Sequence, residues 1–280
     1  MKYVLFNPFS CNGDCEKQIA AYTESITEEH KQLNMTEIES YKEFFEGLSA
    51  DDEIVICGGD GTLNRFINDT DGIDINNPVY YYPAGTGNDF YADIKGESNQ
   101  KPVLINKYII DLPTTTVKGN NYKFINGVGY GIDGYCCEVG DKLHAEGKTA
   151  NYTAIAIKGL LFHYKPTNAK VIVDGKEYDY EKVWIAPTMH GRCYGGGMMP
   201  TPKQERISED NNLSVMVFHG SSKIKTLMIF PSIFKGEHVK NEKYVTIHTG
   251  KSITVKFDAP RALQIDGETI LDVEEYTASV

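Results

Sequence analysis

The sequence predicts an α/β protein with two domains, an N-terminal α/β domain followed by a C-terminal β-sandwich domain. Strand and helix patterns alternate over about the first 113 residues, which is typical of a parallel sheet with helices on both faces. Beyond that point the segments become short, β-branched or aromatic, and are separated by turn residues. The 280 residues, 41% hydrophobic and 24% charged, are sufficient for two folded domains.

Individual elements of the first domain follow from the spacing of apolar residues. Ile19, Tyr22 and Ile26 recur at helical spacing, whereas Glu53–Cys57 is a short apolar run typical of a buried strand. Strands are therefore expected at 2–7, 53–57 and 79–82, and helices at 14–29, 40–48 and from 62 to 68.

The second domain is expected to be built mainly from strands. The predicted strands cover residues 121–129, 169–174, 182–187, 213–219, 244–248 and 252–258. Asp174-Gly175 separates two such runs and predicts a tight hairpin turn, and one helix is expected at 149–163. We expect an α/β domain at 1–113 and a β-sandwich domain at 114–270, with residues 271–280 returning to the first domain.

Composition narrows the classes of function. A net charge of −11 argues against a nucleic-acid-binding protein, which would carry a basic face. The most apolar segment, Thr153–Phe162, is short and interrupted by Lys158 and Gly159, and the first residues do not form a signal peptide, so a cytoplasmic protein is expected. The six cysteines show no metal-ligand spacing and predict free thiols.

A glycine-rich segment, Gly58-Gly59-Asp60-Gly61-Thr62-Leu63-Asn64, follows one predicted strand and opens a helix. Glycines allow backbone N–H groups to approach phosphate oxygens, and a helix N-terminus attracts anions. Because the Asp60 carboxylate would repel phosphate, we expect it to hold magnesium-bound water or to orient an attacking hydroxyl. The alternative is a tight strand-to-helix turn in which Asp60 or Thr62 is the N-cap.

A second glycine-rich segment, Pro83–Phe90, also follows a strand and opens a helix. Both segments would lie at the carboxyl edge of the sheet, where ligands bind in open α/β folds. Gly85, Thr86, Gly87 and Asn88 are therefore candidate phosphate-binding residues, and Asp89 is a second carboxylate. Neither segment is a Walker A motif or a Rossmann fingerprint.

The pair GGDGTLN and PAGTGNDF resembles the diacylglycerol kinase catalytic family, which includes bacterial lipid kinases and sphingosine and ceramide kinases. The resemblance extends over nearly the whole chain, since further motifs occur in the family's order. These are Asn7-Pro8 with Ser10, Tyr194–Gly197, Asp210–Leu213 and Gln264–Glu268. The resemblance implies a nucleotide-binding α/β domain, a β-sandwich domain and an active site in the cleft between them.

The resemblance also implies roles for individual residues. ATP would be bound by Asn7, Pro8, Ser10, Thr36, Gly58, Gly59, Asp60, Gly61, Thr62, Leu63, Asn64 and Thr86. Glu268 matches the family's proton acceptor and Asp266 its acidic neighbour, while Asp60 and Asp89 would complete an acidic cluster around catalytic Mg2+. Carboxylates lying close together are costly unless a cation joins them, which fits magnesium-dependent phosphoryl transfer.

A second, structural Mg2+ is implied at Asp210, with the carbonyls of Ile207 and Asn212 as further ligands. Four positions depart from the family pattern, and two of them change a charge or a backbone preference near these sites. Arg65 stands where the family commonly has glutamate, which reverses a charge beside the first glycine-rich segment. Asn211 replaces a usual glycine, and asparagine is the residue that best tolerates the left-handed backbone there.

The expected reaction is transfer of the γ-phosphate of ATP to a lipid alcohol such as diacylglycerol. NAD kinase, which shares a GGDGT segment, and a catalytically silent nucleotide-binding regulator remain alternatives. A lipid substrate implies transient contact with a membrane surface, so the protein is expected to be cytoplasmic and peripheral at the membrane. Its acidity argues against strong membrane attachment unless basic residues such as Lys158, Lys165 and Lys170 cluster. The sequence is also compatible with a homodimer.

Overall fold

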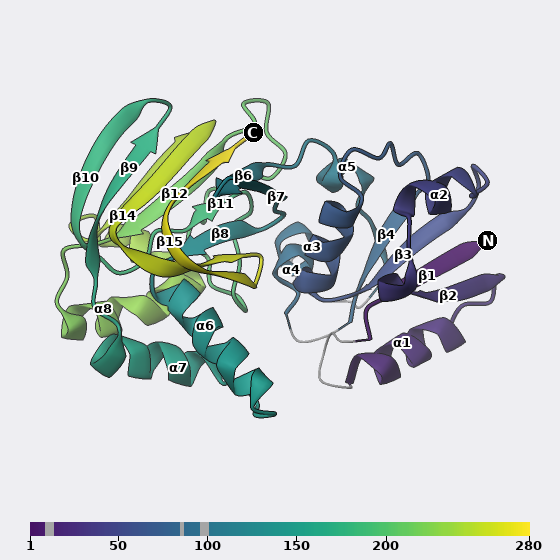
Figure 1. Cartoon of the computed structure of the whole chain (residues 1–280), viewed down its shortest axis with the longest axis horizontal. Coiled ribbons are helices and arrows are strands. Elements are labelled where there is room, and N and C mark those ends of the chain that lie inside the picture. The colour runs from purple at the N-terminus through teal and green to yellow at the C-terminus, as the bar shows by residue number, and fades with distance from the viewer. Residues whose placement is uncertain (9–13, 85–86, 96–100) are drawn as a thin grey trace. The chain divides into compact units, whose positions relative to one another are not determined.

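The computed structural model describes residues 1–8, 14–84, 87–95 and 101–280 (Figure 1). The chain divides into two compact units, Met1–Leu112 and Pro113–Val280. The first unit contains a mainly parallel sheet with helices, and the second contains an antiparallel sheet with helices. This confirms the predicted fold class.

The sheet of the first unit has the order β2-β1-β3-β4-β5. Its strands are β1 (Lys2–Phe6), β2 (His30–Asn34), β3 (Glu53–Gly58), β4 (Val79–Pro83) and β5 (Val103–Leu104). The first four strands are parallel and β5 runs antiparallel to β4. Strand β2 has no counterpart among the predicted strands because its sequence, HKQLN, is polar and none of its residues is fully buried.

Helices cover both faces of this sheet. They are α1 (Asp14–Glu24), α2 (Tyr41–Glu46), α3 (Asp60–Asp69), α4 (Asp89–Lys95), α5 (Asn106–Ile109) and the 3-10 turn η1 (Met35–Glu37). On one face Ile19 of α1 is buried against the sheet, and Tyr22 stacks on Tyr82 with ring centroids 4.2 Å apart. On the other face Tyr81 meets Phe90 of α4 edge-on at 5.8 Å. The consecutive strand residues Tyr81 and Tyr82 thus point to opposite faces of the sheet.

The second unit contains a ten-stranded antiparallel sheet within the described part of the chain. Its strands are β6 (Thr114–Val117), β7 (Asn120–Lys123), β8 (Gly127–Tyr130), β9 (Thr167–Val173), β10 (Lys176–Val183), β11 (Thr188–Met189), β12 (Leu213–Phe218), β13 (Val245–Gly250), β14 (Ser252–Ile265) and β15 (Glu268–Ser279). The long strand β14 pairs with β9 over 253–257 and with β8 over 263–265. Its pairing with β15 shifts register between Lys256 and Arg261. Val171, Val215 and Leu263, from three strands, share one buried core.

Two turns of this sheet bear on the sequence predictions. Asp174 (φ 48°) and Gly175 (φ 82°) join β9 to β10, which confirms the predicted tight hairpin. The expectation that 271–280 return to the first unit is wrong, because β15 pairs with β14 and β6 in the second sheet. Its buried residues Val273, Tyr276 and Ala278 belong to the second unit's core.

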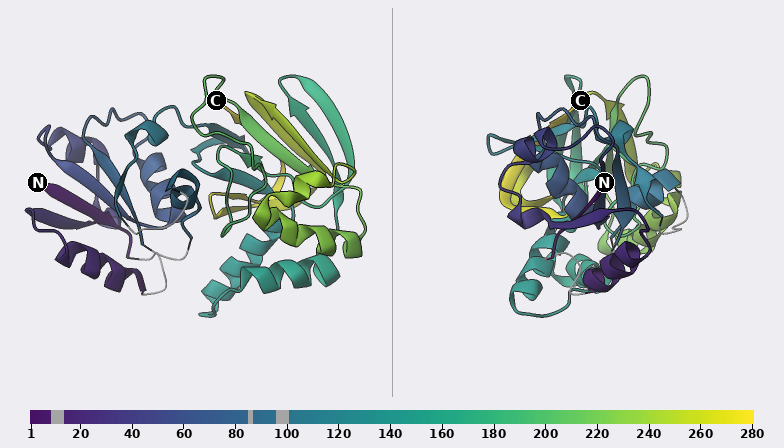
Figure 2. Two further views of the ribbon diagram at one scale, coloured as in Figure 1. Left: turned by 180° about the vertical axis from the view of Figure 1, so that it is seen from behind. Right: turned by 90° about the vertical axis from the view of Figure 1, so that its right-hand side faces the viewer.

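Helices of the second unit gather on one side of its sheet, as Figures 1 and 2 show. They are α6 (Ile132–Ala145), α7 (Tyr152–Lys158), the π-helical turn η2 (Gly159–His163), α8 (Lys223–Ile229), and the 3-10 turns η3 (Phe230–Lys235) and η4 (Glu237–Lys240). Helix α6 was not expected, since Gly134 and Gly140 weaken a helical pattern. Gly134 instead allows close packing on β14, because a Cβ there would lie 2.0 Å from the Ala262 carbonyl oxygen.

No helix in the described ranges is long and apolar enough to cross a membrane. Cys57, Cys136, Cys137 and Cys193 are free thiols, as predicted, whereas Cys11 and the side chain of Cys15 lie outside what the structure describes. Burial raises the pKa of Cys136 to about 12, so this thiol stays protonated at neutral pH.

Candidate functional site

Segments that follow the four parallel strands of the first unit lie at one edge of its sheet. Asn7 follows β1, Thr36 lies two residues beyond β2, and Gly59 and Ala84 follow β3 and β4. Because β1 lies between β2 and β3, the strand order reverses beside β1. Ligands of open α/β sheets bind at such a reversal, outside the carboxyl ends of the strands. The structure thus brings together predicted nucleotide-binding residues that are distant in the sequence.

The two glycine-rich segments are joined to each other through Asp60. Its backbone N–H donates to the Gly87 carbonyl oxygen at 3.0 Å. Its carboxylate accepts the N–H of Asp89 at Oδ2 (2.7 Å) and the N–H of Phe90 at Oδ1 (3.0 Å). Asp60 therefore caps α4, the helix of the other segment, whereas the N-cap of its own helix is Gly59. Its catalytic role stays a prediction.

The first segment has features that suit a phosphate group. A Cβ at Gly59 would lie 2.7 Å from the Gly87 carbonyl oxygen, whereas a Cβ at Gly61 would have nothing within 4 Å. The N-terminus of α3 has no side-chain cap, and the buried Thr62 hydroxyl has no partner among the described residues. Tight backbone packing on one side and open backbone on the other fit phosphate binding at this helix N-terminus.

Other residues predicted to bind the nucleotide are mostly buried or hydrogen-bonded within the first unit, and their nucleotide contacts stay predictions. Leu63 is fully buried and Asn64 nearly so, so these two side chains support α3 from within the unit. In the second segment the Tyr81 hydroxyl donates to Asn88 Oδ1 at 3.0 Å, and Asp89 is buried in the first turn of α4. Pro8 is half-buried after β1. The predicted residues Ser10, Gly85 and Thr86 lie outside the described residues.

Arg65, the reversed charge, pairs within its own helix. Its Nε donates to Asp69 Oδ2 at 3.2 Å, four residues along α3, and both side chains are substantially exposed. Exposed pairs of this kind contribute about 0.3–0.5 kcal/mol. The structure therefore gives Arg65 a partner on the outer face of α3.

In the second unit, Asp266 organises the turn that leads to Glu268. Its carboxylate accepts three backbone N–H groups, those of Ile125 (2.6 Å), Asn126 (2.9 Å) and Gly127 (2.9 Å). Asp266 (φ 46°) occupies the left-handed region in the β14–β15 turn, and Glu268 is exposed at the start of β15. Asp266 thus fixes the backbone beside Glu268, while the chemical roles predicted for both stay predictions.

A buried carboxylate, Asp133 in α6, was not predicted from the sequence as a site residue. The Tyr194 hydroxyl donates to its Oδ2 at 3.0 Å, and Oδ1 has no partner among the described residues. Burial raises the pKa of Asp133 to about 6, because the charged form is desolvated. The sequence pattern that could have indicated Asp133 is GVGYGID over 127–133, a third glycine-rich strand-to-helix segment that ends in a carboxylate.

Tyr194 itself belongs to the tyrosine–triple-glycine motif singled out from the sequence. Gly195, Gly196 and Gly197 all have positive φ, between 64° and 96°. This left-handed backbone is available to glycine at little cost. Tyr194 and Met198 then pair across the turn through mutual backbone hydrogen bonds, and the turn holds the Tyr194 hydroxyl on Asp133.

The predicted structural magnesium segment is only partly arranged for a metal. Asp210 and Ile207 are exposed, and Asn211 (φ 45°) has the left-handed backbone expected there. The Asn212 carbonyl oxygen accepts the Gln204 amide at 2.7 Å. No group of three or more His, Cys, Asp or Glu residues suited to a metal occurs within the described ranges. One carboxylate with backbone carbonyls leaves most Mg2+ ligand positions to water, so this site stays a prediction.

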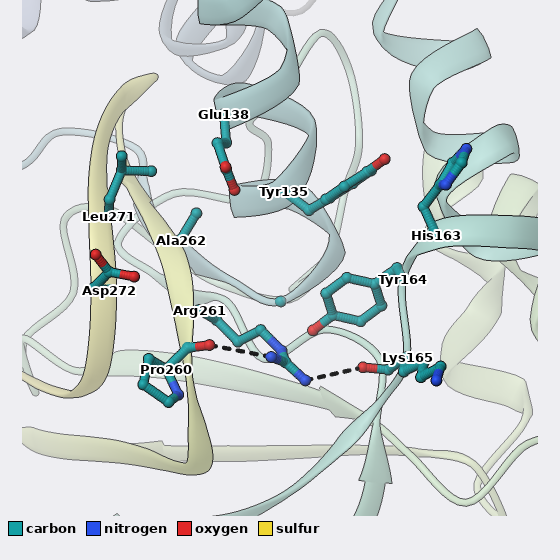
Figure 3. Close-up of a pocket in the computed structure, with 11 residues that line it drawn as sticks. Tyr135, Glu138, His163, Tyr164, Lys165, Pro260, Arg261, Ala262, Leu271 and Asp272 are labelled. Carbon is teal, nitrogen blue, oxygen red and sulfur yellow. Dashed lines mark hydrogen bonds between the residues drawn. The ribbon is translucent and has the colours of Figure 1, made fainter.

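The second unit also contains a cavity of about 360 Å3, shown in Figure 3. The Arg261 guanidinium lies in it, donating to the carbonyl oxygens of Pro260 (3.1 Å) and Lys165 (3.3 Å). Glu138 and Asp272 bring negative charge to the same lining. The lining therefore carries both positive and negative charge, and Arg261 already binds carbonyl oxygens of two chain segments. For these reasons the cavity does not indicate one class of ligand.

Comparison with family profiles covers most of the chain. Residues 2–116 match the diacylglycerol kinase catalytic domain. Residues 126–277 match the YegS C-terminal NAD kinase beta sandwich-like domain. The two matches fall on the two sheets described above.

Individual proteins are also similar to this chain. A diacylglycerol kinase of Mycobacterium tuberculosis (strain ATCC 25618 / H37Rv) is 27% identical over 218 residues, which are 75% of this chain and 67% of that protein. A candidate lipid kinase of Staphylococcus aureus (strain N315) is 29% identical over 229 residues, 79% of this chain and 72% of that protein.

Solved structures from Bacillus anthracis str. Sterne share the fold. A candidate diacylglycerol kinase aligns with a TM-score of 0.68 at 19% identity, covering 99% of this chain and 91% of that one. A diacylglycerol kinase aligns with a TM-score of 0.60 at 18% identity, covering 99% and 93%.

Proposed function

The chain belongs to the family of the diacylglycerol kinase catalytic domain with a YegS-type C-terminal domain, and from this premise we propose that it is an ATP- and magnesium-dependent lipid kinase. The reaction transfers the γ-phosphate of ATP to a hydroxyl group of a lipid such as diacylglycerol. The observation that carries the proposal is the joining of the two glycine-rich segments by the Asp60 carboxylate. A nucleotide kinase needs such a rigid backbone edge to hold phosphates in line for transfer.

The first unit would bind the nucleotide. The uncapped N-terminus of α3 and the open backbone at Gly61 would face phosphate oxygens, and the Thr62 hydroxyl would gain a hydrogen-bond partner. Asn7 and Thr36, at the ends of β1 and β2, would flank the same edge. Bound Mg2+ would neutralise phosphate charge next to Asp60 and Asp89.

The second unit would act on the acceptor. The lipid hydroxyl oxygen forms a bond to the γ-phosphorus while the bond from phosphorus to the bridging oxygen breaks, and ADP leaves. The hydroxyl proton passes to the Glu268 carboxylate, which is exposed and held on a turn anchored by Asp266. This role requires a side chain that reaches substrate without a large rearrangement of its backbone.

The Glu268→Gln variant tests the division between binding and chemistry. Because Glu268 is exposed, the variant should fold normally and bind MgATP with unchanged affinity in calorimetry. Its transfer of phosphate to lipid should fall by a factor of about 100 or more. Wild-type turnover in this variant, or a matching loss of ATP affinity, would remove Glu268 as the proton acceptor.

A further inference from the structure

Two helical segments of the second unit expose large apolar side chains to solvent. They are α7 with its π-helical continuation, and α8. On the first, Ile157 is 46% and Phe162 is 72% exposed; on the second, Ile224 is 72% and Met228 is 70% exposed. Single exposed apolar residues are common, but several gathered on adjoining elements indicate an interaction surface.

The two segments form one surface. Lys223 Nζ donates to the Leu161 carbonyl oxygen at 3.1 Å, which joins α8 to the π-helical turn. The inner sides of both segments, including Leu160 and Ile229, are buried in the same core. Ile224 and Met228 are four residues apart and therefore share one face of α8. Figures 1 and 2 show α7 and α8 side by side.

Charge distinguishes this surface from the rest of the chain. Residues 151–166 and 221–236 carry lysines and no aspartate or glutamate. The lysines are Lys158, Lys165, Lys223, Lys225 and Lys235. The whole chain, in contrast, has 39 acidic and 28 basic residues. Two of the nearby acidic side chains are paired with lysines, Glu138 with Lys142 (2.6 Å) and Glu237 with Lys240 (3.0 Å).

We propose that this surface, the docking face formed by Ile157, Phe162, Ile224 and Met228 with the surrounding lysines, binds the surface of a bilayer rich in anionic phospholipid. Apolar side chains that protrude from an amphipathic surface enter the boundary between headgroups and acyl chains. Lysines beside them are attracted to an anionic leaflet, and the long stems of their side chains let the ammonium groups stay among the phosphates.

The docking face explains how an acidic protein finds a negatively charged membrane. A net charge of −11 repels such a surface as a whole, but screening confines each interaction to about one Debye length. The local charge of the docking face therefore decides orientation and binding. The inference rests on the proposed function only in supposing that the substrate resides in a bilayer, and vesicle binding can be measured without any turnover.

Sedimentation with vesicles tests the proposal. The whole chain should bind vesicles of phosphatidylglycerol and phosphatidylcholine, with affinity that falls as salt rises, and should bind pure phosphatidylcholine weakly. Ile224→Ser/Met228→Ser should reduce affinity for the anionic vesicles by a factor of ten or more. Lys223→Gln/Lys225→Gln should reduce it about 25-fold, from roughly five-fold per lysine.

Matched controls lie on the first unit. Leu104 and Ile110 are 50% and 63% exposed there, and Lys42 is an exposed lysine of α2. Leu104→Ser/Ile110→Ser and Lys42→Gln should leave vesicle affinity unchanged. Equal losses in the controls and in the docking-face variants would overturn the proposal, as would wild-type affinity in both docking-face variants.

A fluorescence measurement locates the contact directly. The chain has one tryptophan, Trp184, and it is buried, so it gives a constant background. In a Phe162→Trp variant the new emission should shift to the blue on anionic vesicles and be quenched by lipids brominated on their acyl chains. No shift and no quenching in vesicle-bound protein would contradict the docking face.

Failure of the docking face and failure of the proposed function can be told apart. Salt-sensitive vesicle binding that depends on Ile224 and Met228, in a protein that phosphorylates no lipid, would uphold the docking face and refute the kinase proposal. Turnover on lipid with no vesicle binding would uphold the kinase proposal and refute the docking face. If Ile224→Ser/Met228→Ser instead dissociates a dimer in sedimentation equilibrium, the face binds a second copy and the membrane proposal is overturned.

Discussion

Replacing Asp60 by alanine should loosen both glycine-rich segments at once. The substitution removes the acceptors of the Asp89 and Phe90 N–H groups, which lie 2.7 and 3.0 Å from the carboxylate oxygens. Hydrogen bonds to charged groups contribute about 1.5–3 kcal/mol each. Since Asp60 is half-buried, the low end applies and the free energy of unfolding should fall by about 3 kcal/mol. The variant should still fold, because domains are stable by about 5–15 kcal/mol.

Calorimetry and amide exchange check this prediction. The Tm of the first unit should fall by about 10 °C in Asp60→Ala, and less in Asp60→Asn, which keeps one acceptor oxygen. Hydrogen exchange at the Asp89 and Phe90 amides should accelerate in the alanine variant. Asp69→Ala, at the other end of α3 in an exposed pair, should change the free energy by under about 0.5 kcal/mol. Wild-type Tm and unchanged protection in Asp60→Ala would refute the capping role.

Three further outcomes follow from the geometry. The folded pKa of Asp133, about 6, lies above its unfolded value of 3.8, so the free energy of unfolding of the wild type should fall as pH rises from about 4 to 6. The amide of Asp133→Asn does not titrate, so the variant should lack this fall. Unfolding measured at several pH values should therefore show the stability of Asp133→Asn relative to wild type rising by about 3 kcal/mol over that interval. Gly59→Ala should destabilise the first unit by about 1–3 kcal/mol through its clash with the Gly87 carbonyl oxygen, whereas Gly61→Ala should be neutral or stabilising, and thermal unfolding compares the two. Asp210→Asn should abolish any rise in Tm on adding Mg2+, and an unchanged magnesium titration would remove the structural-metal prediction.

Much of the fold could be predicted because its signals are local. Glu53–Gly58 is an apolar run that ends in glycine. Asp174-Gly175 forms a tight turn that requires positive φ at both residues, which Asp and Gly tolerate. Helix α6 could not be predicted in the same way. Its glycines at 134 and 140 look unfavourable until β14 and Tyr152 are known to pack against them.

The candidate site shows the same limit. Sequence identified the residue types at Asp60 and Asp266, but the partners of the two carboxylates lie 29 or more residues away in the chain. Both carboxylates accept backbone N–H groups, a role that depends on which loops the fold brings together. Asp133 was missed because a carboxylate in a helix ordinarily faces solvent. Its burial depends on tertiary contacts, among them the hydrogen bond from the Tyr194 hydroxyl and the absence of a side chain at Gly129, where a Cβ would clash with Oδ2.

The most direct test of the proposed function is a transfer assay with ATP labelled in its γ-phosphate. The protein is incubated with Mg2+ and a panel of lipid alcohols in mixed micelles, with NAD as a further acceptor. The proposal predicts label in a lipid product, dependent on Mg2+ and lost in Glu268→Gln. Label in NADP, or no product from a protein shown to bind ATP, would contradict it.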